Sequence, residues 1–330
     1  MVTIKKISGL VILTAFFLSP ALADAVKGNY GFSISPDIGI LYGRSEEIVY
    51  HFPKQDLYLS ELLWDLKPLL YAGFGLDFGP LNTSRKQGFI AALSFKAGLP
   101  ARSGINENRD WFNPDPHYLT HFSRHDAYSR TAIFLDASAG YLWRLVDTLA
   151  LNAYGEFSYM HFSWSAKDGY SQYADNPPWN SDIPKEYYKG EVVRYKQDWL
   201  ILSPGVSLGW DMNRLFSLKT SFNYSPLIYC ADRDDHMLID ANYQDYLYFG
   251  HYLKAGGGLE FRATKNMGLS LSLSYRRISG TRGDTVQQSW RIDYETGDRI
   301  QQTRLYKDEA GAALSTLDLG LAVKFRLTRE

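Results

Sequence analysis

Apolar and polar residues alternate along most of the chain, which predicts β-strands rather than helices. From Met267 to Tyr275 leucine alternates with serine, and residues 318–325 repeat the pattern near the end of the sequence. Successive side chains of a strand point to opposite faces of its sheet, so this alternation gives a strand with one apolar and one polar face.

Similar patterns bring the number of long strands to about ten. The other candidate segments are 30–50, 57–78, 88–98, 133–141, 151–164, 199–211, 215–229 and 245–263. Short turns alternate with long polar connections: the short ones include 146–147, 211–214 and 264–266, and the long ones are 100–130, 167–196, 231–244 and 280–311.

This arrangement is typical of an outer-membrane barrel, with short turns at one end and long loops at the other. An even number of antiparallel strands also closes the sheet and leaves no open edge. The sequence therefore predicts an all-β fold, a ten-stranded antiparallel transmembrane β-barrel with long extracellular loops. The alternative is a soluble β-sandwich or a secreted lectin-like domain, whose strands are usually shorter, about 5–6 residues.

Composition narrows the class of protein. The chain has 330 residues, and 35 basic against 36 acidic side chains nearly cancel, which argues against a nucleic-acid partner. A mean hydropathy of −0.27 argues against a helical membrane protein but is compatible with a barrel, whose strands are half polar. The single cysteine, Cys230, excludes an intramolecular disulfide and a cysteine-rich zinc site.

The first residues resemble an export signal. Lys5 and Lys6 precede an apolar core at 10–18, and Ala21-Leu22-Ala23 fits a small-x-small cleavage site. We therefore expect a signal peptide at 1–23 and a mature barrel at 24–330. Beyond the signal the sequence has no run of 18 apolar residues, so we expect no transmembrane helix.

Asp234-Asp235-His236 is the strongest candidate for chemistry. In an extended chain Asp234 and His236 lie on the same face. A carboxylate beside an imidazole can fix its tautomer and raise its basicity, as a general base requires. The triplet alone fits a solvated acidic loop with an incidental histidine better, because one Asp-x-His is a weak signal.

Several other motifs strengthen this candidate when they are read in order along the chain. They are Tyr42–Tyr50, which ends in Val-Tyr, Asn108-Arg109-Asp110-Trp111, Ser123-Arg124-His125, residues 162–169, Gly190-Glu191 and Tyr195-Lys196-Gln197. Together with Asp234-Asp235-His236, they resemble the motifs of the omptins, the ten-stranded outer-membrane proteases of Gram-negative bacteria. The similarity covers nearly the whole mature chain.

The resemblance implies a mechanism in which a water molecule attacks the peptide bond. His236 matches the general base and Asp234 the residue that orients it. Asn108 and Asp110 match an aspartate pair on the opposite wall that helps to hold the water. This mechanism needs no covalent intermediate, metal or cofactor.

Asn108 departs from the family, which has aspartate at this position. An asparagine can hydrogen-bond a water molecule but cannot carry negative charge or accept a proton. Two carboxylates can share a proton and tune each other, whereas Asn108 and Asp110 cannot. We therefore expect either weakened or altered protease activity or a relative without protease activity.

The resemblance also assigns substrate and lipid contacts. Glu47 and Asp232 match two acids of the pocket for the substrate residue before the cut, where carboxylates favour arginine or lysine. Phe157 and His161 match a tyrosine and an arginine that contact lipopolysaccharide, the activating lipid of omptins. Because histidine is mostly neutral at pH 7, activation by this lipid is one expectation and an interface-belt role for His161 is the other.

Other candidates have less support. His117, His121 and His125 share a segment, but histidines on an irregular loop are a weak metal signal. Cys230 fits a small buried residue better than a nucleophile. Residues 326–330 extend beyond Phe325, although outer-membrane barrels usually end at an aromatic residue.

The sequence therefore predicts a monomeric endopeptidase in the bacterial outer membrane, with its active-site loops facing the exterior. It would cleave exposed peptides or proteins at basic residues. The alternatives are a catalytically impaired omptin-like barrel acting as an adhesin or binding protein, and a structural barrel or small pore.

Overall fold

The computed structural model describes residues 30–51, 57–80, 87–114, 117–174, 178–292 and 298–327. The expected signal peptide, its cleavage site and the last three residues of the chain, 328–330, lie outside these ranges. Within them no helix is long and apolar enough to cross a membrane.

The described residues form strands joined by short connections. The strands are β1 Tyr30–Tyr50, β2 Tyr58–Pro80, β3 Gln87–Gly98, β4 Ala101–Asp110, β5 Asn113–Pro114, β6 His117–Tyr118, β7 His121–Val146, β8 Leu149–Tyr173, β9 Glu186–Tyr187, β10 Glu191–Asp211, β11 Phe216–Ser225, β12 Ile228–His236, β13 Ala241–Tyr248, β14 His251–Arg262, β15 Met267–Ser279, β16 Arg282–Ile292 and β17 Arg299–Leu327.

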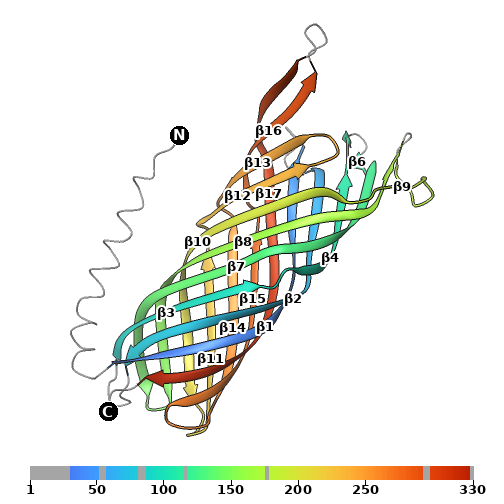
Figure 1. Cartoon of the computed structure of the whole chain (residues 1–330). Coiled ribbons are helices and arrows are strands. Elements are labelled where there is room, and N and C mark those ends of the chain that lie inside the picture. The colour runs from blue at the N-terminus through green and yellow to red at the C-terminus, as the bar shows by residue number, and fades with distance from the viewer. Residues whose placement is uncertain are drawn as a thin grey trace.

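β5 and β6 pair only with each other, and the short β9 pairs with β8. The other strands build a closed antiparallel ring with ten positions (Figure 1). β1 pairs with β17 from Phe32↔Leu327 to Val49↔Ala310, and this ladder closes the barrel. A sandwich has no such closure, so the predicted fold class is confirmed.

At four of the ten positions in the ring, two consecutive strands take the place of one long strand. A proline or glycine lies at each break between them. The breaks are at Pro100 between β3 and β4, Pro226 between β11 and β12, Gly250 between β13 and β14, and Gly280 between β15 and β16. Proline has no N–H for the ladder, and the two glycines have φ of 135° and 70°, which most side chains avoid.

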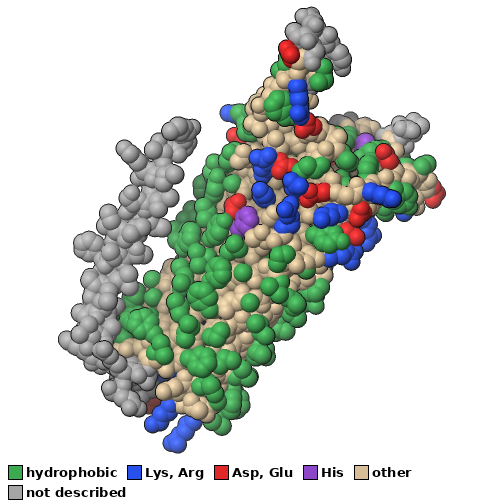
Figure 2. All heavy atoms as spheres, viewed as in Figure 1, with side chains coloured by type: hydrophobic (Ala, Val, Ile, Leu, Met, Phe, Trp, Pro, Cys, Tyr) green, Lys and Arg blue, Asp and Glu red, His purple; other side chains and the backbone are tan. Residues whose placement is uncertain are grey.

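An apolar belt covers the outside of the barrel on the side of the short turns (Figure 2). Along β10 the outward positions change from the charged Arg194 and Asp198 to the exposed Leu200 and Leu202. On β1 the exposed apolar side chains end at Tyr42. Beyond this belt the strands continue into a polar extension at the opposite end from the short turns (Figure 1).

Side chains fill the lumen at the level of the belt. Asp136 forms ion pairs with Arg276 and with Lys254, 3.1 Å away, and Lys254 also pairs with Glu156 at 2.9 Å. Buried charges of opposite sign compensate one another there, as a low-dielectric interior requires. This packing argues against the small-pore alternative.

An aromatic layer lies in the lumen above these ion pairs. It consists of Trp64, Phe162, Trp164 and Tyr195, all fully buried. The Tyr195 ring stacks on Trp64 with centroids 5.4 Å apart and on Trp164 at 5.8 Å. The layer gives the polar extension a rigid base.

The strands run further than the alternation predicts. Much of the segments 100–130 and 231–244 belongs to β4, β7, β12 and β13 rather than to loops. Above the belt the outer face meets water and the inner face lines a polar site, so both faces are polar and the period of two is hidden. The Asp234-Asp235-His236 triplet therefore ends a strand instead of lying in a loop.

Candidate active site

One wall of the site is the end of β12, where Asp234 and His236 face the lumen. His236 Nε2 lies 2.5 Å from Asp234 Oδ2. Burial lowers the pKa of His236, but the nearby carboxylates, Asp234 first among them, more than offset this, and the pKa is raised above its ordinary value of 6.5. Asp235 points the other way and accepts a hydrogen bond from Arg233 at 2.8 Å. The predicted alternation of this triplet is thus observed.

The opposite wall carries Asp110, at the end of β4. Ser60 Oγ on β2 donates to Asp110 Oδ1 at 2.6 Å, and Asn108 Nδ2 donates to Asp110 Oδ2 at 3.3 Å. Burial raises the pKa of Asp110 to about 6, although both hydrogen bonds and the charge of His236 lower it. Asn108 therefore acts on this wall as a donor that holds the carboxylate.

Electrostatic interaction connects the two walls. The Asp110 carboxylate contributes to the raised pKa of His236, after the larger effects of burial and Asp234. Because such an effect requires proximity, Asp110 and the Asp234–His236 pair face a shared space. Glu107 lies outside this space and pairs with Arg109 at 3.0 Å.

A cluster of buried acids lies beside His236. We call Glu47, Asp232, Asp234 and Asp245 the acid cluster; each is at most 4% exposed. Tyr195 donates a hydrogen bond to Asp232 at 3.0 Å, and Gln197 donates to Tyr195 at 2.7 Å. Burial and then mutual repulsion raise the pKa of Glu47 and of Asp232.

Comparison with known proteins now identifies the family. The model of the Omptin family matches residues 28–327. This chain belongs to the omptin family. The crystal structure of outer membrane protease OmpT from Escherichia coli is similar to it, with a TM-score of 0.79 and 18% identity over 90% of this chain and 97% of that one. The translocator domain of autotransporter NalP from Neisseria meningitidis aligns at a TM-score of 0.36 and 13% identity, over 97% of each chain. No curated protein matches the sequence.

Asp245 also belongs to the acid cluster, although the sequence alone did not predict it as a site residue. It pairs directly with Asp232 across the β12–β13 hairpin. Burial raises the pKa of Asp245 to about 7, despite a hydrogen bond with Thr285, and the charge of Asp234 adds to the shift. The register of the hairpin would have revealed Asp245, but that register depends on the length of the turn, which the sequence pattern left open.

The predicted lipid contacts lie on the outer wall. His161 Nδ1 on β8 is 2.9 Å from Asp198 on β10, and Tyr159 also donates to Asp198, at 2.7 Å. His161, which matches the omptin arginine expected to contact phosphate, therefore has the Asp198 carboxylate as its partner. Phe157, four residues before His161 on β8, is partly exposed.

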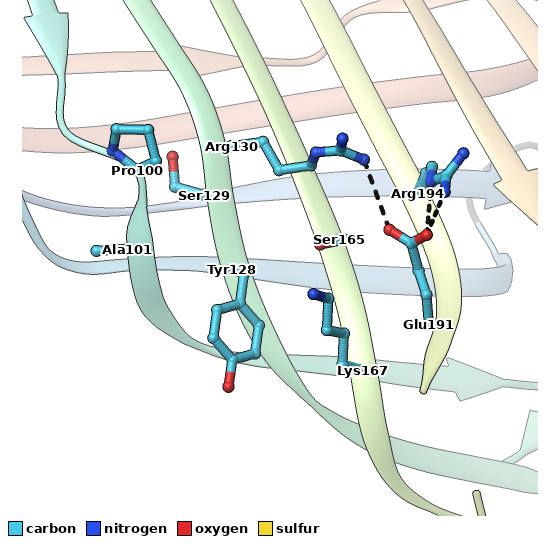
Figure 3. A pocket seen from close by; sticks show the side chains of 9 residues that line it. All are labelled: Pro100, Ala101, Tyr128, Ser129, Arg130, Ser165, Lys167, Glu191 and Arg194. Atoms are coloured by element: carbon cyan, nitrogen blue, oxygen red, sulfur yellow. Dashed lines mark hydrogen bonds and ion pairs between the residues drawn. The ribbon is translucent and has the colours of Figure 1, made fainter. Parts of the chain in front are cut away.

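A basic pocket of about 490 Å³ opens further from the belt on the same wall (Figure 3). Arg130, Lys167 and Arg194 line it, and Figure 3 shows both arginines turned toward Glu191. Arg130 lies 3.6 Å from the Glu191 carboxylate, which also pairs with Arg194. Three basic side chains against one acid leave the pocket positively charged.

The three histidines that share the segment 117–125 contact separate partners. His117 contacts the Tyr58 carbonyl at 2.7 Å, His121 the Thr120 hydroxyl at 2.8 Å, and His125 the Asp168 carbonyl at 2.5 Å. Across the described residues no group of three or more His, Cys, Asp or Glu side chains is arranged to hold a metal ion. Cys230 is fully buried.

The raised pKa values of the buried acids predict that the stability of the fold falls as pH rises. Asp110 and Asp245 ionise near pH 6 and 7 in the folded barrel but at about 3.8 when unfolded, so the folded state binds more protons between these values. We expect the midpoint of thermal unfolding in detergent to be lower at about pH 8 than at about pH 5, by on the order of 5 °C.

The matched variant is Asp110→Asn, which removes one of these titrations. It should reduce the difference between the two pH values, whereas Asp235→Asn on the outer face of β12 should not. An unfolding midpoint that rises with pH over this range would contradict the assignment.

Proposed function

We propose that this omptin is an outer-membrane endopeptidase that cleaves exposed peptides or proteins at basic residues. The observation that carries the proposal is the Asp234–His236 pair facing Asp110 across the end of the barrel. Family membership and the likeness to the OmpT fold support the same activity. A single closed chain supplies both walls, so we expect the protein to act as a monomer with this end facing the exterior.

The geometry suggests how each group acts on a water molecule. Asp234 engages His236 Nε2, which leaves Nδ1 to accept a proton from water. The water oxygen then attacks the carbonyl carbon, and Asp110, held by Ser60 and Asn108, orients the water. When the tetrahedral intermediate collapses, the C–N bond breaks and the proton on Nδ1 passes to the departing amine. Positioned acid–base groups of this kind contribute about 10²–10⁴-fold to rates.

Preference for a basic residue follows from Glu47 and Asp232. Both carboxylates are buried near Asp234, and Tyr195 of the aromatic layer donates a hydrogen bond to Asp232. A cationic side chain placed there would neutralise part of the repulsion and donate charge-assisted hydrogen bonds to the carboxylates. We therefore expect the residue before the cut to be arginine or lysine.

The decisive test is cleavage of a fluorogenic peptide containing Arg-Arg by the purified barrel with lipopolysaccharide. His236→Ala should lower kcat by about 10²-fold or more, because the general base is lost. If the wild-type barrel releases no more product than His236→Ala, the protease proposal fails. Binding of host proteins without cleavage would then favour the catalytically impaired barrel, an adhesin or binding protein, which Asn108 makes the second candidate.

Asn108→Asp tests whether the altered wall limits the reaction. The substitution restores a second carboxylate beside Asp110, which can accept a hydrogen bond from the water and share a proton with its neighbour. We expect kcat to rise severalfold above the wild-type value, with KM little changed. Ser60 is left unchanged in this variant, because its hydroxyl contacts the side chains at positions 108 and 110. An unchanged or lower kcat would show that Asn108 is not the limiting departure.

Lipopolysaccharide remains the proposed activating lipid, and the basic pocket offers a site for its phosphates. Arg130 and Arg194 lie on the same outer wall as His161 and further from the apolar belt, where we expect them to reach the phosphates of the lipid headgroup. Replacing both with alanine should raise the lipid concentration needed for half-maximal activity by about tenfold.

The control for this experiment is Lys265→Ala, which removes an exposed lysine at the short-turn end. Inorganic phosphate added in place of lipid distinguishes anion binding from lipid binding. A larger effect of His161→Ala than of the double arginine variant would place the lipid at the position that the family resemblance implies instead.

A further inference from the structure

Asp245 adds a carboxylate to the wall beside the proposed substrate pocket. We propose that Asp245 is a third acid of the pocket for the basic side chain, together with Glu47 and Asp232, and that it increases the preference for a cationic over a neutral residue there. The inference rests on the proposed function, because it deepens the substrate specificity of the same site.

The β12–β13 hairpin places Asp245 in the pocket. Asp232 and Asp245 are direct cross-strand partners, and the two are 3% and 2% exposed. Asp232 also forms a hydrogen bond with the backbone of Asp245. The Glu47 carboxylate, on β1, is close enough to both that their charges raise its pKa. Three carboxylates from three strands therefore converge on one buried space.

These acids have no compensating cation within the described part of the chain. Among its ion pairs, none joins a lysine or arginine to Glu47, Asp232 or Asp245. The Glu47 Oε2 and Asp245 Oδ1 atoms are buried and, in the described structure, lack a hydrogen-bond partner. Like charges directly opposite on a sheet destabilise it, and buried atoms without partners cost more. An arrangement this unfavourable indicates a site prepared for a ligand.

The chemistry of the site points to an organic cation. The described residues offer no arrangement of acids suited to a metal ion. A hydrogen bond from Tyr195 orients the Asp232 carboxylate, and one from Thr285 orients that of Asp245. The other oxygen of each carboxylate is thereby held in place to accept a hydrogen bond from a ligand. A guanidinium presents five N–H donors in a plane, enough to reach more than one carboxylate at once.

The fold separates this role from the catalytic one. Asp245 lies on β13, whereas the Asp234–His236 pair ends β12, and neither His236 nor Asp110 contacts Asp245 in a hydrogen bond or ion pair. Loss of the Asp245 charge should therefore change substrate binding much more than the chemical step.

The test compares two peptides that differ only in arginine or citrulline before the cut. Citrulline keeps the shape of arginine and removes its charge. For Asp245→Asn we expect kcat/KM on the arginine peptide to fall about tenfold or more, mainly through KM, and little change on the citrulline peptide. Asp245→Glu should restore most of the preference, and Asp235→Asn should leave it unchanged.

A second measurement does not depend on catalysis. Agmatine, a small guanidinium compound, should raise the midpoint of thermal unfolding of the wild-type barrel, because a ligand that binds only the folded state stabilises it. Asp245→Asn should need about tenfold more agmatine for the same rise. Tryptophan fluorescence can follow unfolding, since Trp64 and Trp164 lie in the aromatic layer.

The two measurements separate the possible failures. If the wild-type barrel cleaves neither peptide but agmatine stabilises it more than it stabilises Asp245→Asn, the proposed function fails and the cation pocket stands. An arginine-to-citrulline ratio unchanged in Asp245→Asn would overturn the role of Asp245. Equal agmatine effects on both proteins, or no effect on the wild type, would overturn it as well.

Discussion

The ladder between β1 and β17 is the constraint on which the other features depend. It runs from the belt to the polar extension, and it brings Glu47 on β1 within electrostatic reach of Asp232 and Asp234 on β12. The closed ring also fixes Asp110 on the wall opposite His236. Strand ends are usually pliable, but here each end hydrogen-bonds to two neighbours and is therefore held in place.

The polar extension concentrates negative charge where the fold can least accommodate it. In the lumen below, Asp136 and Glu156 have Lys254 and Arg276 as partners. In the acid cluster, His236 is the only basic partner seen among the described residues, and it pairs with Asp234. Stability alone would select the compensated arrangement, so the uncompensated charges of the acid cluster support the proposal that this cluster binds a substrate.

Much of the fold follows from local pattern, whereas the site depends on register between strands. Leucine and serine alternation in 267–275 identifies a strand because one face meets lipid and the other the lumen. The same rule fails in β12 and β13, where both faces are polar. Asp234 and His236 were recognisable as neighbours on one strand. Asp245 and the basic pocket were not, because their residues meet only through pairing between separate strands, and Asn108 showed its role as a donor only beside Asp110.

The central claim is that the Asp234–His236 pair and Asp110 act on one shared space. Titration of the His236 imidazole by NMR in detergent micelles, assigned by its absence in His236→Ala, tests this claim most directly. The account predicts a midpoint above 6.5 in the wild type, a large decrease in Asp234→Asn and a smaller decrease in Asp110→Asn. A midpoint that Asp110→Asn leaves unchanged would contradict the account, because the two walls would then not share a site.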